Sequence, residues 1–288
     1  MAPAPGHKPT KAQRTAATRE RERVAAEEQQ RKDRRNGMLA KWGVVVAGLI
    51  VVALIAVVVI NTVRGRIPDA GPAPQGGNAQ GGITLLSSTD TAPTGTDMVD
   101  VATLPAEPAA EGTVPEGITS VTNGPLQVVA YVDINCVHCA DFESTNGDQI
   151  EQWLEQGEAT VEYRMVDYLS APNNQNYSAR AANAAYCVAD QKPEAYNGFV
   201  AALFATYDEH QGKGLDNAAI TQLAQEHGAD IASCVEDGTF RSAVEHTTRQ
   251  ARVAGVAGTP TVFVDGKNWA LDGEDKTFTD WAGAKIAG

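Results

Sequence analysis

Two cysteines separated by two residues, Cys136 and Cys139, carry the clearest chemical signal in this sequence. They follow an apolar run, 126–134, that predicts a buried strand, and they begin a predicted helix over 136–156. A cysteine at a helix N-terminus faces unpaired backbone N–H groups and the positive end of the helix dipole, which both stabilise a thiolate. The spacing also lets the two sulfurs close a disulfide within one turn. The motif therefore predicts disulfide exchange, with Cys136 attacking and Cys139 resolving the mixed disulfide.

Two polar residues beside the cysteines are candidates for tuning them. His138 lies between them, where a positive charge or a hydrogen bond would favour the Cys136 thiolate. The alternative for His138 is a solvent-facing residue on the first helical turn. Asp133 has two interpretations: it carries the Cys139 proton if burial raises its pKa, or it caps the helix that begins at the cysteines.

Zinc binding is the competing chemistry for such a cysteine pair. A structural zinc site needs four ligands, and the pair supplies two. The other cysteines, Cys187 and Cys234, lie apart and lack the paired spacing of zinc ligands. We therefore predict no metal and no cofactor.

The second motif is the run GTPTVFVDG over 258–266. Cis peptide bonds are overwhelmingly X-Pro bonds in tight turns, and Pro260 stands directly before a predicted strand. A cis Pro260 would leave the backbone of Thr259 free to pair with an extended substrate peptide beside the cysteines. Thr259 and Pro260 are therefore predicted substrate-binding residues.

The elements that must position these motifs follow the order β–α–β, a run of helices, then β–β–α. Strands are expected at 126–134, 159–165 and 261–264, with a short strand near Trp269 and a last helix from about 277. An intervening segment, about 170–255, contains predicted helices at 177–190, 193–208, 217–227 and 239–255. The order predicts an α/β fold with an inserted helical domain.

These features resemble the DsbA-like thiol–disulfide oxidoreductases of the thioredoxin superfamily, close to the membrane-tethered Gram-positive members. The resemblance covers roughly 118–288 and rests on Asp133, Cys136 and Cys139 (D-x-x-C-x-x-C), on the G-T-P-T-x-x-V run, and on the helical insertion. It implies a thioredoxin fold whose insertion caps the active site. It further implies that unfolded or reduced exported proteins are oxidised and that a quinone-linked membrane oxidase re-oxidises the pair. Val137 departs from the family, because proline commonly follows the first cysteine there.

The remaining cysteines, Cys187 and Cys234, fall in the predicted insertion. An even cysteine count in an oxidising compartment favours pairing. If Cys136 pairs with Cys139, the other bond is Cys187–Cys234, which would have a structural role. The alternative is two buried free thiols.

Charge and hydropathy divide the chain. Residues 1–41 contain 11 Lys and Arg and 5 Asp and Glu, a net +6, whereas 67–288 contain 10 and 31, a net −21. Between them, 43–60 carry no charge and would span ~27 Å as a helix. We therefore predict a single-pass transmembrane anchor at 42–63, with the basic tail 1–41 in the cytoplasm and the remainder of the chain outside. A cleaved signal peptide is disfavoured because no small-residue cleavage site follows.

Residues 64–117 are rich in Pro, Gly and Ala and predict a flexible, disordered extracytoplasmic linker, in which 83–88 could add an edge strand. The catalytic domain is expected at 118–288. No nucleic-acid partner is predicted. Two other functions stay open: a reductase or isomerase of the same fold, and a non-enzymatic redox-sensing or docking module with an acidic surface.

Overall fold

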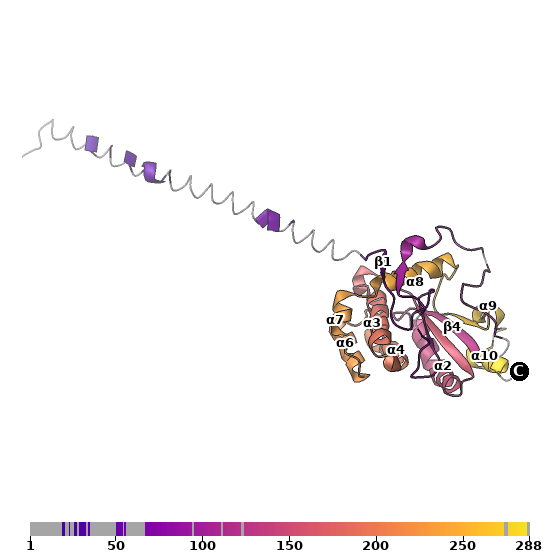
Figure 1. The fold of residues 1–288 in the computed structure, drawn as a ribbon. Coiled ribbons are helices and arrows are strands. Elements are labelled where there is room, and N and C mark those ends of the chain that lie inside the picture. Colours follow the sequence, from indigo (N-terminus) through magenta and orange to yellow (C-terminus); the bar gives the residue numbers. More distant parts are fainter. Residues whose placement is uncertain are drawn as a thin grey trace, which may run out of the picture. The chain divides into compact units, whose positions relative to one another are not determined.

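The computed structural model describes residues 67–286 apart from 94, 111, 122–123 and 274–275, together with scattered helical residues between 19 and 55. The chain divides into two units, 1–66 and 67–288 (Figure 1). Among the described residues, no helix has both the length and the apolar composition needed to cross a bilayer. Most of the predicted anchor at 42–63 lies outside the described residues, as does most of the predicted tail at 1–41.

The second unit contains a five-stranded mixed sheet with the order β2-β5-β4-β6-β7. The central strands β4 and β5 run parallel, and β2, β6 and β7 each run antiparallel to a neighbour. Strands β4 and β5 are buried on both faces, as expected where helices cover a sheet on both sides. The strands of this sheet are Gly82–Leu85 (β2), Leu126–Val132 (β4), Ala159–Met165 (β5), Thr261–Val264 (β6) and Lys267–Asn268 (β7).

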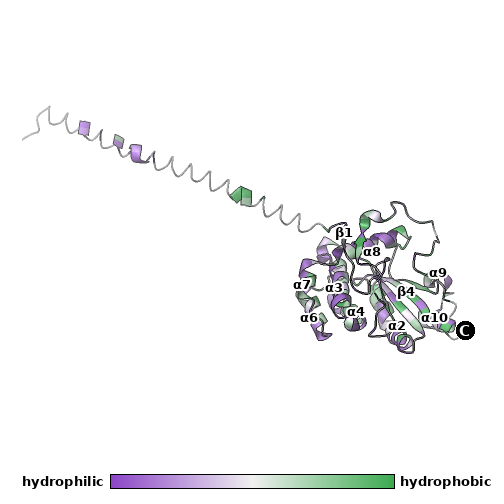
Figure 2. Ribbon diagram, in the orientation of Figure 1, coloured by the Kyte–Doolittle hydropathy of each residue, from purple (hydrophilic) through white to green (hydrophobic). Residues whose placement is uncertain are grey.

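Helices pack on both faces of the sheet. Helix α2 packs against β5, α4 and α10, and α8 packs against the opposite face of β5. Figure 2 shows green and purple alternating along these helices, as expected when one stripe faces a core. The α-helices are Val137–Glu155 (α2), Tyr177–Gln191 (α3), Tyr196–Ala205 (α4), Tyr207–His210 (α5), Asn217–Glu226 (α6), Ala232–Asp237 (α7), Arg241–Val253 (α8), Trp269–Asp272 (α9) and Phe278–Ile286 (α10). Short 3₁₀ helices lie at Val101–Thr103 (η1), Pro172–Asn174 (η2) and Pro193–Ala195 (η3).

The predicted order of elements is confirmed: β4–α2–β5, then the inserted helices α3 to α8, then β6–β7 and the last helices. Three details differ. The helix expected over 193–208 is divided into η3, α4 and α5, and neither α7 nor α9 was predicted. Helix α7 has six residues, which is too short for hydrophobic periodicity to reveal.

The prediction of a flexible linker over 64–117 is wrong for much of its described part. Strand β1 (Ala70–Pro72) pairs with β3 (Met98–Asp100), and β2 adds to the free edge of β5. Ile83 and Leu85 of β2 are fully buried. The edge strand expected within 83–88 is therefore present. Few bulky apolar residues suffice here because an existing sheet edge supplies the hydrogen-bond partners of the added backbone.

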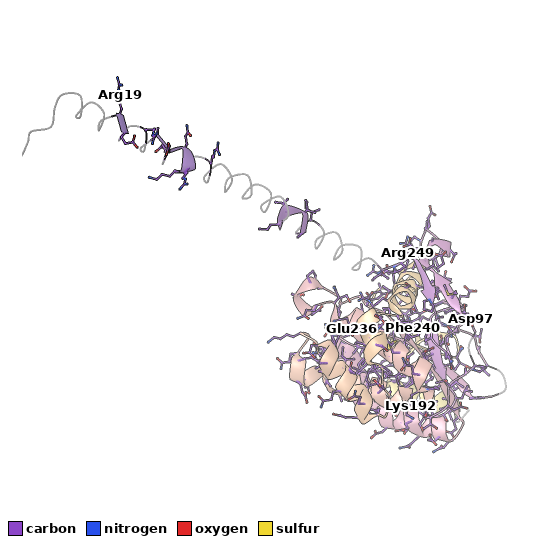
Figure 3. All side chains as sticks on the ribbon, turned by 60° about the vertical axis from the view of Figure 1, so that its left-hand side comes forward. Arg19, Asp97, Lys192, Glu236, Phe240 and Arg249 are labelled. Atoms are coloured by element: carbon purple, nitrogen blue, oxygen red, sulfur yellow. A yellow bond between two sulfur atoms is a disulfide. The ribbon has the colours of Figure 1, made fainter. Side chains whose placement is uncertain are left out.

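Helices α3, α4, α6 and α7 of the insertion lie together on one side of the second unit (Figure 1). Helix α3 lies at their centre, and twelve of its residues are buried. Phe240, labelled in Figure 3, is buried and donates its backbone N–H to Asn183 Oδ1 of α3, whereas Glu236 of α7 is exposed. The insertion therefore has its own apolar interior around α3.

Candidate active site

Cys136 stands at the N-cap of α2, directly after the β4 strand and a short turn. Because β4 is buried and the turn is closed by a hydrogen bond from Cys136 N–H to Asp133 O, the position of this cysteine is fixed by the centre of the fold. Cys139 lies in the first turn of α2, and its N–H donates to Cys136 O at 3.1 Å. Cys136 is 6% exposed and Cys139 only 1%, so Cys136 is the more accessible of the two. Both are free thiols in this structure.

The second predicted motif lies beside the first. The Thr259–Pro260 peptide bond is cis, and the Cys136 thiol donates to the Thr259 carbonyl at 3.3 Å. The structure therefore brings together two motifs that are 123 residues apart in the sequence. The role of Thr259 and Pro260 in binding a substrate peptide stays a prediction.

The environments of the two thiols shift their pKa values in opposite directions. The Cys139 thiol donates a hydrogen bond that lowers the pKa of Cys136 to about 5, although partial burial opposes this. Hydrogen bonds from the Thr259 side chain and from the backbone N–H groups of Cys139 and His138 lower it further. Burial raises the pKa of Cys139 far above its ordinary value, and the neighbouring Cys136 sulfur adds to this. At neutral pH the site therefore holds one thiolate and one thiol.

Asp133 begins the turn that holds Cys136 and is fully buried. Its carboxylate accepts hydrogen bonds from the backbone N–H groups of Asn135 (2.8 Å) and Leu169 (2.9 Å). Neither donor belongs to α2, so Asp133 does not cap that helix. Burial raises the pKa of Asp133 to about 6, despite the opposing hydrogen bonds. The backbone N–H of Asp133 lowers the pKa of Cys139, and the charge of Cys136 raises the pKa of the Asp133 carboxyl, so this carboxyl lies within electrostatic reach of the cysteine pair.

His138 and Val137 lie on the exposed side of the first turn. The His138 imidazole is largely exposed, and its Nδ1 lies 3.9 Å from Asp141 Oδ2. Its backbone N–H is the group of this residue that stabilises the Cys136 thiolate. Val137 is 40% exposed and presents an apolar side chain next to the reactive sulfur. An effect of the imidazole on Cys136 stays a prediction.

The structure adds one residue at the site that sequence reasoning missed. Asn135 precedes Cys136, is 4% exposed, and donates from Nδ2 to Gly212 O at 3.1 Å. Gly212 follows α5, so this contact ties the inserted helices to the turn that holds Cys136. The sequence carried no signal for it, because an asparagine before a cysteine has no distinctive spacing.

The other two cysteines form a disulfide in the insertion. Cys187 of α3 and Cys234 of α7 are bonded, with a Cα–Cα distance of 6.0 Å. Both residues are buried, and neither belongs to α2 or to the turn before it. The bond joins the central helix of the insertion to the short helix α7. Among the residues that the structure describes, no group of three or more His, Cys, Asp or Glu side chains is arranged to hold a metal ion.

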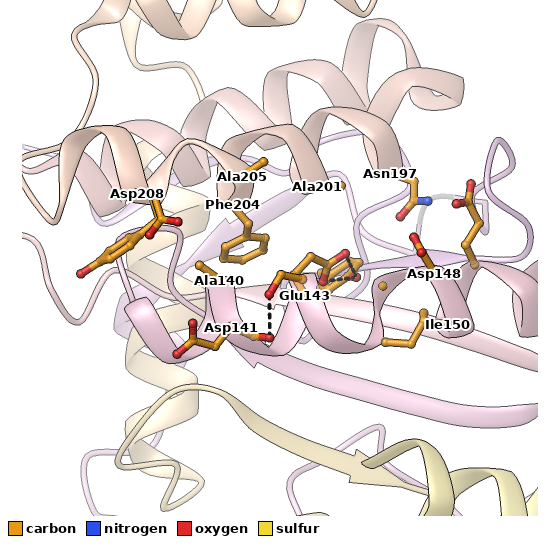
Figure 4. A pocket seen from close by; sticks show the side chains of 15 residues that line it. Ala140, Asp141, Glu143, Asp148, Ile150, Asn197, Ala201, Phe204, Ala205 and Asp208 are labelled. Carbon is orange, nitrogen blue, oxygen red and sulfur yellow. Dashed lines mark hydrogen bonds between the residues drawn. The ribbon is translucent and has the colours of Figure 1, made fainter. Parts of the chain in front are cut away.

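A cavity of about 430 Å³ lies next to the site, between α2 and α4. Figure 4 shows Glu143 inside it, with Asp141 and Asp148 nearby on the same helix. The Tyr163 hydroxyl donates to Glu143 Oε2 at 3.1 Å. Burial raises the pKa of Glu143 to about 7, although the hydrogen bond from Tyr163 opposes the rise. A carboxyl that titrates near neutrality therefore lies one turn beyond Cys139.

Replacing Glu143 by Gln is expected to change the pH dependence of stability. A carboxyl whose folded pKa lies above its unfolded value contributes stability below about pH 4.5, which is lost as the pH rises through about 7. Glutamine stays neutral and can still accept from Tyr163. The variant should match the wild type at pH 4 and exceed its free energy of unfolding by about 2 kcal/mol at pH 8, as measured by urea unfolding.

The matched control for this prediction is Asp148→Asn, which removes an exposed carboxylate from the same helix. That control should leave the difference between pH 4 and pH 8 unchanged. An equal gain in both variants would mean that surface charge, and not burial of Glu143, is responsible.

Comparisons with known proteins agree with this geometry. A thioredoxin family model matches residues 121–283. The solved structure of reduced DsbA from Mycobacterium tuberculosis is 31% identical with a TM-score of 0.50, and the match covers 60% of this chain and 88% of that one. MdbA, a thiol-disulfide oxidoreductase from Actinomyces oris, is 20% identical with a TM-score of 0.50, and covers 57% and 81%. At that identity the second match indicates the fold alone.

A curated relative matches this chain over only a part of its own length. The serine/threonine-protein kinase PknE of Mycobacterium tuberculosis is 28% identical over 149 residues, which is 49% of this chain and 26% of the kinase. This chain therefore spans about a quarter of the length of the curated relatives that it matches.

Proposed function

Because the chain belongs to the thioredoxin superfamily as a DsbA-like thiol–disulfide oxidoreductase, we propose that it is a disulfide oxidase acting on exported proteins outside the cytoplasm. One observation carries the proposal: the pKa of Cys136 falls to about 5 while that of Cys139 rises. A thiolate stabilised in this way favours the reduced form of the pair. A stabilised reduced form makes the oxidised form a stronger oxidant. The protein would therefore donate its disulfide to substrates.

The proposed reaction transfers two electrons from a substrate dithiol to the Cys136–Cys139 disulfide. A substrate thiolate attacks Cys136 Sγ, the Cys136–Cys139 bond breaks, and the Cys139 sulfur leaves and takes up a proton. The second substrate thiolate then attacks the substrate sulfur in the mixed disulfide. The Cys136 thiolate leaves readily because its pKa is low, and the substrate disulfide is complete.

Asp133 is the proposed proton carrier for Cys139. The pKa of its carboxyl, about 6, lets it exchange a proton near neutral pH, and the charge of Cys136 acts on this carboxyl. When a mixed disulfide is resolved by Cys139, that thiol must lose its proton to become the nucleophile. A buried carboxylate is the suitable acceptor because Cys139 is almost completely buried, with 1% of the residue exposed.

Three further parts of the proposal rest on the sequence. The apolar run at 43–60 supports a membrane anchor, and the positive charge before it supports a cytoplasmic N-terminus. That orientation supports an extracytoplasmic active site, where disulfides persist. A membrane oxidase that accepts electrons from the Cys136–Cys139 dithiol would return the protein to its active form.

The proposal predicts that Cys139→Ala traps a substrate. Cys136 of this variant is first converted to a mixed disulfide with 5-thio-2-nitrobenzoate and then mixed with a reduced exported protein that carries one cysteine. Attack on Cys136 should release one equivalent of the yellow thiolate and leave a covalent adduct, visible on a non-reducing gel, that lasts because neither partner retains a second thiol. Cys136→Ala, treated identically, should form little adduct because Cys139 is buried. The opposite pattern would reverse the assigned roles.

A second candidate function is redox sensing, and the kinase match favours it. A region resembling this chain makes up 26% of PknE, a serine/threonine-protein kinase, so a domain of this kind occurs within a kinase chain. A sensor would exchange with one dedicated partner, whereas an oxidase would form adducts with many exported proteins. A Cys139→Ala chain expressed in cells distinguishes these cases by the number of different adducts. A reductase or isomerase would differ from both in its redox potential.

A further inference from the structure

His210, the last residue of α5, is a buried titratable side chain to which the proposed reaction gives no role. It is 7% exposed. Its ring makes edge-to-face contacts with Tyr177 of α3 and Tyr207 of α5, at centroid distances of 5.0 and 5.4 Å. These two rings hold the imidazole inside the insertion, and the one hydrogen bond of its side chain leads toward the cysteine site.

Two hydrogen bonds at Gly212 connect this imidazole with the turn that holds Cys136. The N–H of Gly212 donates to His210 Nδ1 at 3.2 Å, and the carbonyl of Gly212 accepts from Asn135 Nδ2 at 3.1 Å. Asn135 directly precedes Cys136, and its own N–H donates to Asp133 Oδ1 at 2.8 Å. Gly212 is therefore held on one side by His210 and on the other by the residue next to the reactive cysteine.

The loop that contains Gly212 packs on the same aromatic ring as His210. A Cβ at Gly214 would lie 2.2 Å from Cγ of Tyr177, so the backbone of this loop lies directly against that ring. Gln211 has a φ of 46°, in the left-handed region that is unfavourable for a residue with a side chain. A loop in this conformation needs contacts that hold it, and the bond to His210 is one of them.

His210 must be neutral to accept this hydrogen bond. Because Nδ1 is the acceptor, the single ring proton is on Nε2, which is buried and has no hydrogen-bond partner among the described residues. Burial lowers the pKa of His210 below its ordinary value, which favours the neutral ring at pH 7. A second proton on the ring would place a donor opposite the Gly212 N–H and break the bond.

The titratable groups around the imidazole leave it neutral at pH 7. Tyr177 and Tyr207 are phenols, and burial raises the pKa of Tyr177 to about 12. The Glu209 carboxylate on α5 favours a charged imidazole, but less strongly than burial opposes it. On α3, the Arg180 guanidinium lies 5.7 Å from the Tyr177 ring centroid, where its charge disfavours a second cation. From the turn before α2, the charge of Asp133 acts on Tyr177.

We propose that the neutral His210 imidazole positions the turn that holds Cys136, through Gly212 and Asn135. It is a positioning residue, because its side-chain hydrogen bond goes to Gly212 and not to a sulfur. While the turn is fixed, Cys136 keeps the hydrogen bonds that stabilise its thiolate. Loss of the acceptor on His210, by substitution or by protonation, loosens the turn and makes this thiolate less stable.

Two substitutions separate the hydrogen bond from the packing of the ring. His210→Phe keeps an aromatic ring between Tyr177 and Tyr207 but removes the acceptor. His210→Asn keeps an acceptor, because asparagine Oδ1 lies about where histidine Nδ1 lies, and it does not take up a proton. His227→Asn, at the C-cap of α6, makes the same change at another histidine of the insertion and is the matched control.

The first readout is the pH profile of alkylation of Cys136 by iodoacetamide in the reduced full chain, followed by mass spectrometry. Only the thiolate reacts, so the pH of half-maximal rate reports the pKa of Cys136. This midpoint should lie near pH 5 in His210→Asn. In His210→Phe it should rise to about pH 6, because a lost hydrogen bond changes the equilibrium about tenfold. His227→Asn should have the wild-type profile.

The second readout is hydrogen–deuterium exchange of the Gly212 amide in the full chain, relative to the intrinsic rate at each pH. At pH 7 the wild type and His210→Asn should be protected equally, and His210→Phe about fivefold less. At pH 4 the protection in the wild type should fall to that of His210→Phe, because the imidazole is then protonated. His210→Asn should keep its protection and corrects for the titration of other groups.

Asn135→Ala breaks the same connection at its other end and tests the proposal if His210→Phe does not fold. It should raise the alkylation midpoint as far as His210→Phe does, and the double variant should raise it no further. The proposal is wrong if Asn135→Ala keeps the wild-type midpoint, if the two His210 variants share one midpoint, or if wild-type Gly212 is as protected at pH 4 as in His210→Asn. Alkylation does not depend on the direction of disulfide exchange, so such a failure would not contradict the proposed oxidase activity.

Discussion

Replacing Cys136 by alanine is expected to lower the rate of disulfide exchange more than about a hundredfold at pH 7. The reason is that Cys136 is almost entirely thiolate at this pH, whereas burial keeps Cys139 protonated. The remaining cysteine is therefore a poor nucleophile and is hardly accessible. The measurement is the rate at which the full chain oxidises a fluorescent dithiol peptide in the presence of oxidised glutathione.

The same assay contains its own controls. Replacing Val137, which is exposed between the cysteines, with alanine should leave exchange within a few-fold of the wild type because both sulfurs remain. If Cys136→Ala retained activity within tenfold of the wild type, the nucleophile would have to be Cys139, and the assignment based on exposure and pKa would be wrong.

Removing the Cys187–Cys234 disulfide is expected to lower the free energy of unfolding by about 4 kcal/mol. The bond spans 47 positions, and a closed loop of that length restricts the unfolded chain strongly. Alanine at both positions avoids an unpaired thiol. Chemical unfolding of the full chain should show this loss, and the rate of exchange at Cys136 below the unfolding transition should not change.

Two results would contradict the structural role of this bond. A change of less than about 1 kcal/mol would mean that the unfolded chain is not restricted by it. A changed redox potential of the Cys136–Cys139 pair in a fully folded variant would mean that the second disulfide communicates with the first. The natural control is the wild-type protein under mild reduction, which opens Cys136–Cys139 and leaves the buried bond intact.

The sequence was sufficient to predict the central part of the fold, because the patterns that identify its elements lie in contiguous residues. The strand, the cysteine pair and the following helix are contiguous, and the apolar run of β4 marks a strand covered on both faces. The Thr259–Pro260 bond could also be anticipated, because a proline directly before a strand limits the conformations available to the turn. Local pattern thus located both halves of the site.

Apart from the edge strand expected within 83–88, the order of the described part of 67–117 could not be predicted, because its stability is not local. Strand β2 has four residues, and it is ordered because Arg164 and its neighbours on β5 offer an unpaired edge. A Pro-rich and Gly-rich composition predicts disorder when the segment is considered alone. The contact of Tyr186 Oη, which donates to Gly81 O at 2.7 Å, shows how the remote helix α3 fixes it.

The environments of individual site residues could also not be predicted from the sequence. The interpretations of Asp133 as helix cap or proton carrier could be separated only by seeing that its hydrogen bonds come from Asn135 and Leu169. Spacing cannot reveal the direction in which a side chain points. The link from Asn135 to Gly212 joins residues 77 positions apart and depends on how the insertion packs.

The measurement that tests the central claim most directly is the equilibrium of the Cys136–Cys139 pair with a glutathione buffer at pH 7, made on the full chain. A low pKa for Cys136 stabilises the reduced pair, so we predict a potential more oxidising than about −200 mV, above that of the glutathione pool. Such a value means that the disulfide is donated to substrates. A potential below about −270 mV would contradict the account, because the dithiol would then be the stored reagent and the protein would act as a reductase.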